Sequence, residues 1–287
     1  MNYLLLFISV FTDTLKNMYY NQFSETKLKN NRDTLLFNVV SCVGSVVLFL
    51  ILGASFKISA FSFLMALVFA LVTVGAQYLS LLAMSLGSMS YSVLFTYLSM
   101  LIPTIFGIVA YKAPFGWLQI VGVILMLATF VLSLDLNSDK SVNLKWFAAA
   151  MGSFVCWGLV GVCQQIHQNS SFSGELDGFL LWTFILSTVI FTVIWALTPK
   201  KGVEPGYKIK SGATLFILIA GLFIGGINKI NLYLSGAMNP VIFFPIVNGG
   251  VIILSSLAAI FVFREKLSKP QIAGLALGMV SVLCLGM

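Results

Sequence analysis

The chain has 287 residues, of which 59% are hydrophobic and only 9% are charged, with a formal net charge of +7. Soluble globular domains carry about 25% charged residues, so this composition excludes that class and indicates an integral membrane protein. The apolar runs are continuous over about 20 residues, which favours membrane helices over the short alternating segments of a β-barrel. The basic residues lie between these runs, so the positive charge predicts membrane orientation and gives no reason to expect nucleic-acid binding.

Apolar segments of membrane-spanning length follow one another with short polar connections. We predict an all-α integral membrane protein with ten transmembrane helices and no soluble domain. The first segment contains Asp13 and Lys16, so we do not expect a cleaved signal peptide. The ten helices are placed at about 3–22, 34–54, 59–83, 88–111, 115–134, 144–165, 176–197, 213–235, 239–262 and 269–286.

A sparse internal repeat divides the chain into two halves. The stretch Gly87-Ser88-Met89, followed by Phe95, is echoed at the same spacing by Gly236-Ala237-Met238, followed by Phe244. We therefore predict two five-helix repeats, at residues 1–137 and 138–287. Because five is an odd number, the two repeats are expected to insert in opposite senses. Such inverted repeats are typical of many secondary transporters.

The distribution of Lys and Arg predicts the orientation in the membrane. The connections after the first, fifth, seventh and ninth predicted helices carry twelve Lys or Arg residues, whereas the opposite side has only Lys57 and Lys112. The positive-inside rule places the twelve in the cytoplasm, so both termini are expected outside the cell membrane, which we take to be that of a prokaryote.

The second half of the chain contains stretches that resemble a known transporter family. They are Gly236, with its counterpart Gly87 in the first half, the proline-flanked stretch Pro240-Val241-Ile242-Phe243-Phe244-Pro245, and the stretch Phe263-Arg264-Glu265-Lys266-Leu267-Ser268-Lys269-Pro270-Gln271-Ile272-Ala273-Gly274. These resemble the drug/metabolite transporter superfamily, and within it the ten-helix EamA-like family. In the first half the acidic position of the last stretch is Ala113, so that copy departs from the pattern. The resemblance implies a ten-helix transporter of small metabolites.

One short motif adds a narrower resemblance. Gly225-Gly226-Ile227-Asn228-Lys229 is similar to the Gly-Ala-Leu-Asn-Lys motif with which nucleotide-sugar transporters of the same superfamily contact the nucleotide, and it matches at Gly, Asn and Lys. The companion Phe-Tyr-Asn-Asn motif is absent, because the corresponding helix reads Phe179-Leu180-Leu181-Trp182-Thr183-Phe184. The resemblance therefore implies a similar geometry but not the same substrate.

Two charged positions inside apolar spans are the strongest candidates for a substrate site. Lys229 would cost roughly 2.5–3.5 kcal/mol near a helix centre, so we expect it either to bind an anion or to pair with an acid from another helix. Candidate partners are Asp13, Glu175 and Asp177. Asp13 and Lys16 are three residues apart on one helical face, so they either pair with each other or face a central cavity.

The predicted substrate-binding residues combine these charges with polar and aromatic side chains. In the families that the chain resembles, the fourth and ninth helices line the cavity, although ordinary packing remains an alternative for each aromatic ring. His167 is the only histidine and is expected at the solvated interface, and we predict no metal or cofactor. The predicted set is Asp13, Lys16, Tyr20, Tyr91, Phe95, Trp157, Asn228, Lys229, Phe244 and Asn248.

Secondary active transport by alternating access is the function that these features favour. The substrate is predicted to be a small anionic or zwitterionic metabolite, with coupling to protons or another ion left open. The alternative substrate is a cationic or aromatic compound, held by Asp13 and an aromatic cage of Tyr20, Tyr91, Trp157 and Phe244. We do not predict an enzyme, because the sequence lacks the common hydrolase motifs. A membrane receptor or scaffold is the alternative from another class, and the oligomeric state is open.

Overall fold

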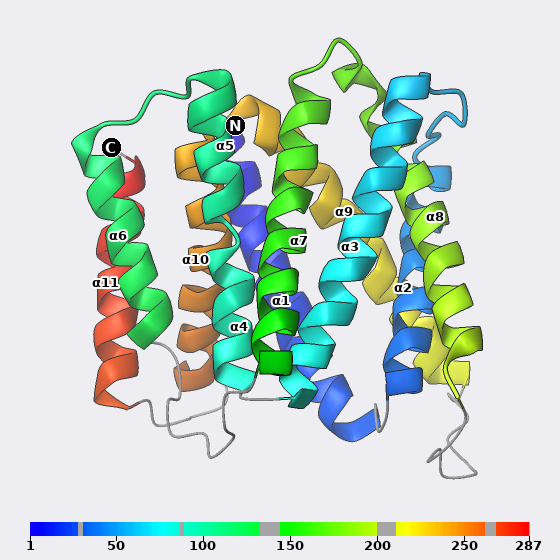
Figure 1. The fold of residues 1–287 in the computed structure, drawn as a ribbon, viewed down its shortest axis with the longest axis horizontal. Helices are drawn as coiled ribbons and strands as arrows, with labels where there is room; N and C mark the ends of the chain where they lie inside the picture. Colours follow the sequence, from blue (N-terminus) through cyan, green and yellow to red (C-terminus); the bar gives the residue numbers. More distant parts are fainter. Residues whose placement is uncertain (28–30, 87–88, 133–143, 200–210, 262–267, 287) are drawn as a thin grey trace. The chain divides into compact units, whose positions relative to one another are not determined.

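The computed structural model describes residues 1–27, 31–86, 89–132, 144–199, 211–261 and 268–286. Within these ranges every regular element is a helix, which confirms the all-α prediction (Figure 1). In chain order the elements are α1 (Asn2–Lys27), α2 (Asn31–Ile51), α3 (Ala60–Leu86), α4 (Met89–Leu98), α5 (Leu101–Tyr111), α6 (Trp117–Leu132), α7 (Leu144–Gln168), the 3-10 helix η1 (Ser173–Glu175), α8 (Leu176–Leu197), α9 (Ser211–Ala237), α10 (Pro240–Phe261) and α11 (Lys269–Gly286).

Several helices have the length and composition of membrane spans. Five of the described segments are long and apolar enough to cross a membrane: 32–51, 60–83, 144–168, 173–197 and 214–237. Four shorter apolar segments, 95–111, 117–132, 240–255 and 269–285, accompany them. These segments are compatible with a membrane protein.

The predicted helix at 88–111 is interrupted. Helix α4 ends at Leu98 and α5 begins at Leu101. Pro103 explains the interruption, because its ring lacks an N–H and clashes with the carbonyl group four residues earlier, that of Ser99. The Ser99 carbonyl instead accepts from the backbone N–H of Ile102 at 3.1 Å. Pro245, by contrast, lies inside the continuous helix α10.

The helices form two compact units that do not follow the two halves of the sequence. Unit 1 comprises 1–14, 75–166 and 234–287, and unit 2 comprises 15–74 and 167–233. Helices α1, α3, α7 and α9 therefore contribute to both units. The division into repeats at 1–137 and 138–287 remains a prediction.

Unit 1 contains a close contact between α6 and α11, which lie side by side in Figure 1. The hydroxyl of Ser281 donates to the carbonyl oxygen of Gly122 at 2.7 Å. A Cβ on Gly122 would lie 2.7 Å from a side-chain carbon of Leu285. Small side chains at such contacts allow helix backbones to approach closely, which is the usual packing mode in membranes.

Unit 2 is built around α2, which packs against both α8 and α9. On the α8 side, the rings of Phe49 and Phe184 stack at 6.0 Å. On the α9 side, the Ser45 hydroxyl donates to the Gly221 carbonyl oxygen at 2.7 Å. Gly221 and Gly225 make this close packing possible, since a Cβ on either residue would press against α2.

Candidate functional site

An ion pair in unit 2 joins two of the apolar helices. The ammonium of Lys229 on α9 lies 2.7 Å from Oδ1 of Asp177 on α8 and 2.9 Å from Oδ2. Asp177 is one of the three acids that the sequence offered as partners for Lys229. The two side chains are 37% and 36% exposed, so the pair is formed but not sealed inside the protein.

The local structure explains why these two charges meet. Asp177 belongs to the first turn of α8, where unpaired backbone N–H groups and the helix dipole favour a negative charge. Lys229 lies eight residues before the end of α9 at Ala237, which places it about 12 Å from that end at 1.5 Å per residue. Both positions are therefore displaced from the helix centres.

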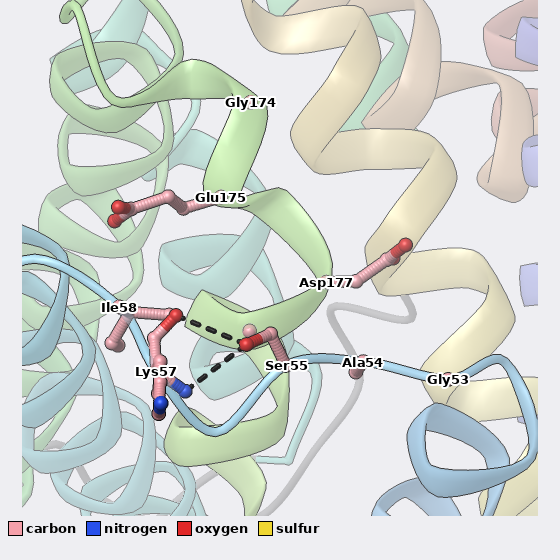
Figure 2. A pocket seen from close by; sticks show the side chains of 9 residues that line it. Gly53, Ala54, Ser55, Lys57, Ile58, Gly174, Glu175 and Asp177 are labelled. Carbon is pink, nitrogen blue, oxygen red and sulfur yellow. Dashed lines mark hydrogen bonds between the residues drawn. The ribbon is translucent and has the colours of Figure 1, made fainter.

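A small hollow opens beside Asp177 at this end of unit 2 (Figure 2). Its volume is about 260 Å³, and it is lined by Gly53, Ala54, Ser55, Lys57, Ile58, Gly174, Glu175, Asp177 and Gly178. In Figure 2 the Asp177 side chain points toward α9, whereas Glu175 points the other way. One wall is the connection between α2 and α3, which turns at Gly53 with a left-handed φ of 73°. The hollow is thus bounded by charged side chains and by backbone.

Glu175 ties the two walls of the hollow together. Its carboxylate accepts the backbone N–H of Ser59 at 3.0 and 3.1 Å and the Ser59 hydroxyl at 2.8 Å. Ser59 immediately precedes α3, so these bonds satisfy donors at the start of that helix. The carboxylate of Glu175 is therefore already occupied by protein donors.

The network continues from Ser59 to a buried histidine. The Ser59 hydroxyl lies 3.2 Å from that of Ser62, which in turn lies 3.2 Å from Nε2 of His167. His167 is 0% exposed, and its ring stacks on Phe179 with centroids 4.1 Å apart. The expectation of a solvated histidine is wrong, because the ring is buried and its two nitrogens face Ser62 of α3 and the neighbouring Gln168. The Ser-x-x-Ser spacing before an apolar run was the only local signal of this network.

The other predicted residues of unit 2 are Asn228, Lys16 and Tyr20. The Asn228 amide donates to the carbonyl oxygen of Ile224 on its own helix at 2.9 Å. Lys16 is partly buried. The side chain of Tyr20 lies outside the described residues. The contact described for the Asn228 side chain is therefore within α9, whereas that of Lys229 is with Asp177 on α8.

Two of the predicted aromatic residues of unit 1 lie on α7 or against it. The indole N–H of Trp157 donates to the Ser80 hydroxyl at 3.1 Å, and Ser80 lies 2.6 Å from the Ser153 hydroxyl. Phe244 is buried, and its ring lies against Gly161, one turn after Trp157. Both rings therefore lie along the same stretch of α7. The aromatic cage stays a prediction, because the side chains of Tyr20 and Tyr91 lie outside the described residues.

The remaining predicted residues of unit 1 make internal contacts. Phe95 packs edge-on against Trp146 at 5.9 Å and against Phe147 at 6.1 Å. The Asn248 amide donates to the Phe244 carbonyl oxygen at 2.9 Å. Asp13 is partly buried. Among the described residues, no three His, Cys, Asp or Glu side chains gather closely enough to hold a metal ion.

Comparison with known proteins identifies a similar fold but no activity. No protein-family model matches the chain. An uncharacterized protein of Haemophilus influenzae is 22% identical over 196 residues, a match that spans 66% of this chain and 63% of that protein. The crystal structure of another protein matches this chain with a TM-score of 0.72 at 15% sequence identity. The match covers 100% of this chain and 98% of the other. At this identity the likeness shows a shared fold alone.

Proposed function

We propose that the chain is a secondary active transporter of a small anionic or zwitterionic metabolite. In this proposal ten spanning helices, arranged as two inverted five-helix repeats, alternate the access of a central site between the two sides of the membrane. Lys229 provides the contact to the anionic group of the substrate. The hollow beside Asp177 opens on the side that the Lys and Arg distribution predicts to be outside.

The observation that carries the proposal is the exposed ion pair between Lys229 and Asp177. Charges within apolar helices are costly, and they are typical of substrate or ion pathways. An ion pair that served packing alone would be expected to bury both groups, yet each side chain remains more than one third exposed. The adjoining hollow of about 260 Å³ gives a small solute room to approach Asp177. The pair is therefore formed and still within reach of a ligand.

Uptake into proteoliposomes tests this function. The full chain is reconstituted, and the entry of a radiolabelled dicarboxylate, amino acid and sugar phosphate is compared with that of a quaternary amine. We expect one of the anionic or zwitterionic solutes to accumulate, and Lys229→Ala to abolish its uptake. Lys145→Ala is the matched control, because it removes an exposed lysine at the start of α7.

Three results would contradict the proposal. Unchanged uptake by Lys229→Ala would remove this lysine from the substrate site. Uptake of the quaternary amine alone would favour the cationic alternative with Asp13. Binding of a solute without any entry into the vesicles would favour a receptor.

A further inference from the structure

We propose that Asp177 is the binding site of a coupling cation, a proton or a sodium ion, and that this cation releases Lys229 to bind the substrate anion. The inference rests on the proposed function, because it assigns to Lys229 the anionic group of the substrate. It adds the cation site and narrows the substrate to an anion.

The Asp177 carboxylate and the substrate anion compete for the ammonium group of Lys229. Lys229 contacts both carboxylate oxygens of Asp177, at 2.7 and 2.9 Å. An incoming anion must draw the ammonium away from at least one of these contacts. Since the attraction between unit charges rises as the local dielectric constant falls, an anion alone competes poorly with Asp177 in a partly dry site.

The Asp177 carboxylate would lose its partner when Lys229 turns to the substrate. Among the described residues, Oδ1 of Asp177 is buried and accepts no hydrogen bond, so the ammonium of Lys229 is its stabilising partner. Leaving a buried charged oxygen without a partner is costly. Another cation must therefore replace Lys229 at Asp177 when the lysine turns to the substrate.

The net charge of the site also favours binding of a cation together with the anion. The pair is neutral, and binding an anion or a cation alone would leave the site with a net charge. Binding both together removes one unit of that net charge, which restores neutrality for a singly charged anion: the cation sits on the Asp177 carboxylate, and Lys229 keeps its proton and its positive charge opposite the substrate. Even in this partly exposed site, the remaining charge attraction therefore favours joint occupancy over either ligand by itself.

The surroundings single out Asp177 as the cation site. It lines the hollow, which gives a small cation a route to its carboxylate. The other charged residues that line the hollow are Lys57, from the connection between α2 and α3, and Glu175, whereas Lys229 does not belong to its lining. Glu175 is occupied by the N–H and hydroxyl of Ser59. Helix α2 packs along α8 but carries its described charges at its opposite end, where Arg32 donates to the Thr198 carbonyl oxygen.

Equilibrium binding of radiolabelled sulfate to the purified full chain tests the exchange. Sulfate keeps its charge between mildly acidic and alkaline pH, so any pH dependence belongs to the protein. In one arm the pH is lowered in sodium-free N-methylglucamine buffer, and in the other sodium replaces N-methylglucamine at alkaline pH. We expect sulfate affinity to rise about tenfold in one arm, within the range of coupling between sites, and that arm identifies the cation.

The variants isolate the two charges. Asp177→Asn removes the competing carboxylate, so it should bind sulfate about tenfold more tightly than the unaltered protein and without dependence on either cation. Asp177→Glu keeps the carboxylate and should keep the dependence. Lys229→Gln and the double variant Asp177→Asn/Lys229→Gln should lose sulfate binding, which excludes a general effect of net charge.

Two outcomes would overturn the exchange. One is a sulfate affinity of Asp177→Asn no higher than that of the unaltered protein, including no binding to either. The other, which needs no variant, is a sulfate affinity of the unaltered protein that responds to neither cation. If Lys229→Ala nevertheless abolished uptake in proteoliposomes, the proposed function would stand and only the coupling site would fail.

Discussion

The hydroxyl of Ser45 on α2 donates a 2.7 Å hydrogen bond to the backbone carbonyl oxygen of Gly221 on α9. A serine reaches a main-chain carbonyl on another helix only where the two backbones come close. Here a Cβ added to Gly221 would lie 2.9 Å from the Cα of Gly44. Glycine at both positions makes this approach possible, as at many helix contacts in membranes.

Gly221→Ala is expected to destabilise the protein by about 1–3 kcal/mol, the usual cost of overpacking. The new Cβ would overlap the backbone carbonyl oxygen of Ser41, which cannot move as a flexible side chain can. Thermal unfolding in detergent measures the effect. Gly226→Ala is the control, because a Cβ there meets nothing within 4 Å, and it should be neutral or gain up to about 1 kcal/mol of helix propensity. Equal losses in the two variants would contradict the close crossing.

A double-mutant cycle on Lys229→Ala and Asp177→Ala should give a coupling energy of about 1 kcal/mol. The value is modest because both side chains are more than one third exposed, which weakens an ion pair through screening. The exchange Lys229→Asp/Asp177→Lys should recover most of the coupling, although it places a positive charge in the first turn of α8. Chemical unfolding of the unaltered protein, the two single variants, the double variant and the exchanged pair supplies the free energies. A coupling energy of zero would mean that the two charges do not interact in the folded protein.

Glu175→Ala is expected to accelerate hydrogen exchange at the backbone amide of Ser59. That N–H donates to both carboxylate oxygens of Glu175. It is one of the donors at the start of α3 that have no acceptor within the helix itself. Glu175→Gln retains one acceptor oxygen and should give an intermediate rate. Exchange mass spectrometry of the segment between α2 and α3 reports the change. If the exchange at Ser59 matched that of the unaltered protein in both variants, another group would have to hold the start of α3.

The predicted orientation can be read from cysteine labelling in intact cells. Ser55→Cys lies in the exposed wall of the hollow and should react with a membrane-impermeant maleimide added from outside. Lys145→Cys is also exposed, but the charge count places it in the cytoplasm, so it should react only after permeabilisation. The unaltered protein, with its four cysteines, provides the background. The reverse pattern would place both termini in the cytoplasm.

The sequence alone predicted features that depend on composition and on local rules. Continuous apolar runs indicated an all-helical membrane protein, because the length of such runs and the absence of alternation are properties of the chain itself. The four-residue spacing of Gly221 and Gly225 is likewise a local pattern, typical of close helix packing in membranes. The interruption before Pro103 was harder to place, since Pro245 obeys the same local rule and α10 remains continuous around it.

The tertiary structure decided which distant groups meet. Lys229 had three candidate partners in the sequence, and the packing of α8 and α9 in unit 2 selected Asp177, because helix register and side-chain reach choose among acids of identical chemistry. The same holds for His167, which contacts Ser62 of α3 and Phe179 of α8 in addition to its chain neighbour Gln168. The sequence thus determined that a lysine in an apolar helix needs a partner, since an isolated charge there is costly. Only the fold determined that this partner is an aspartate in the first turn of α8, at the edge of an open hollow.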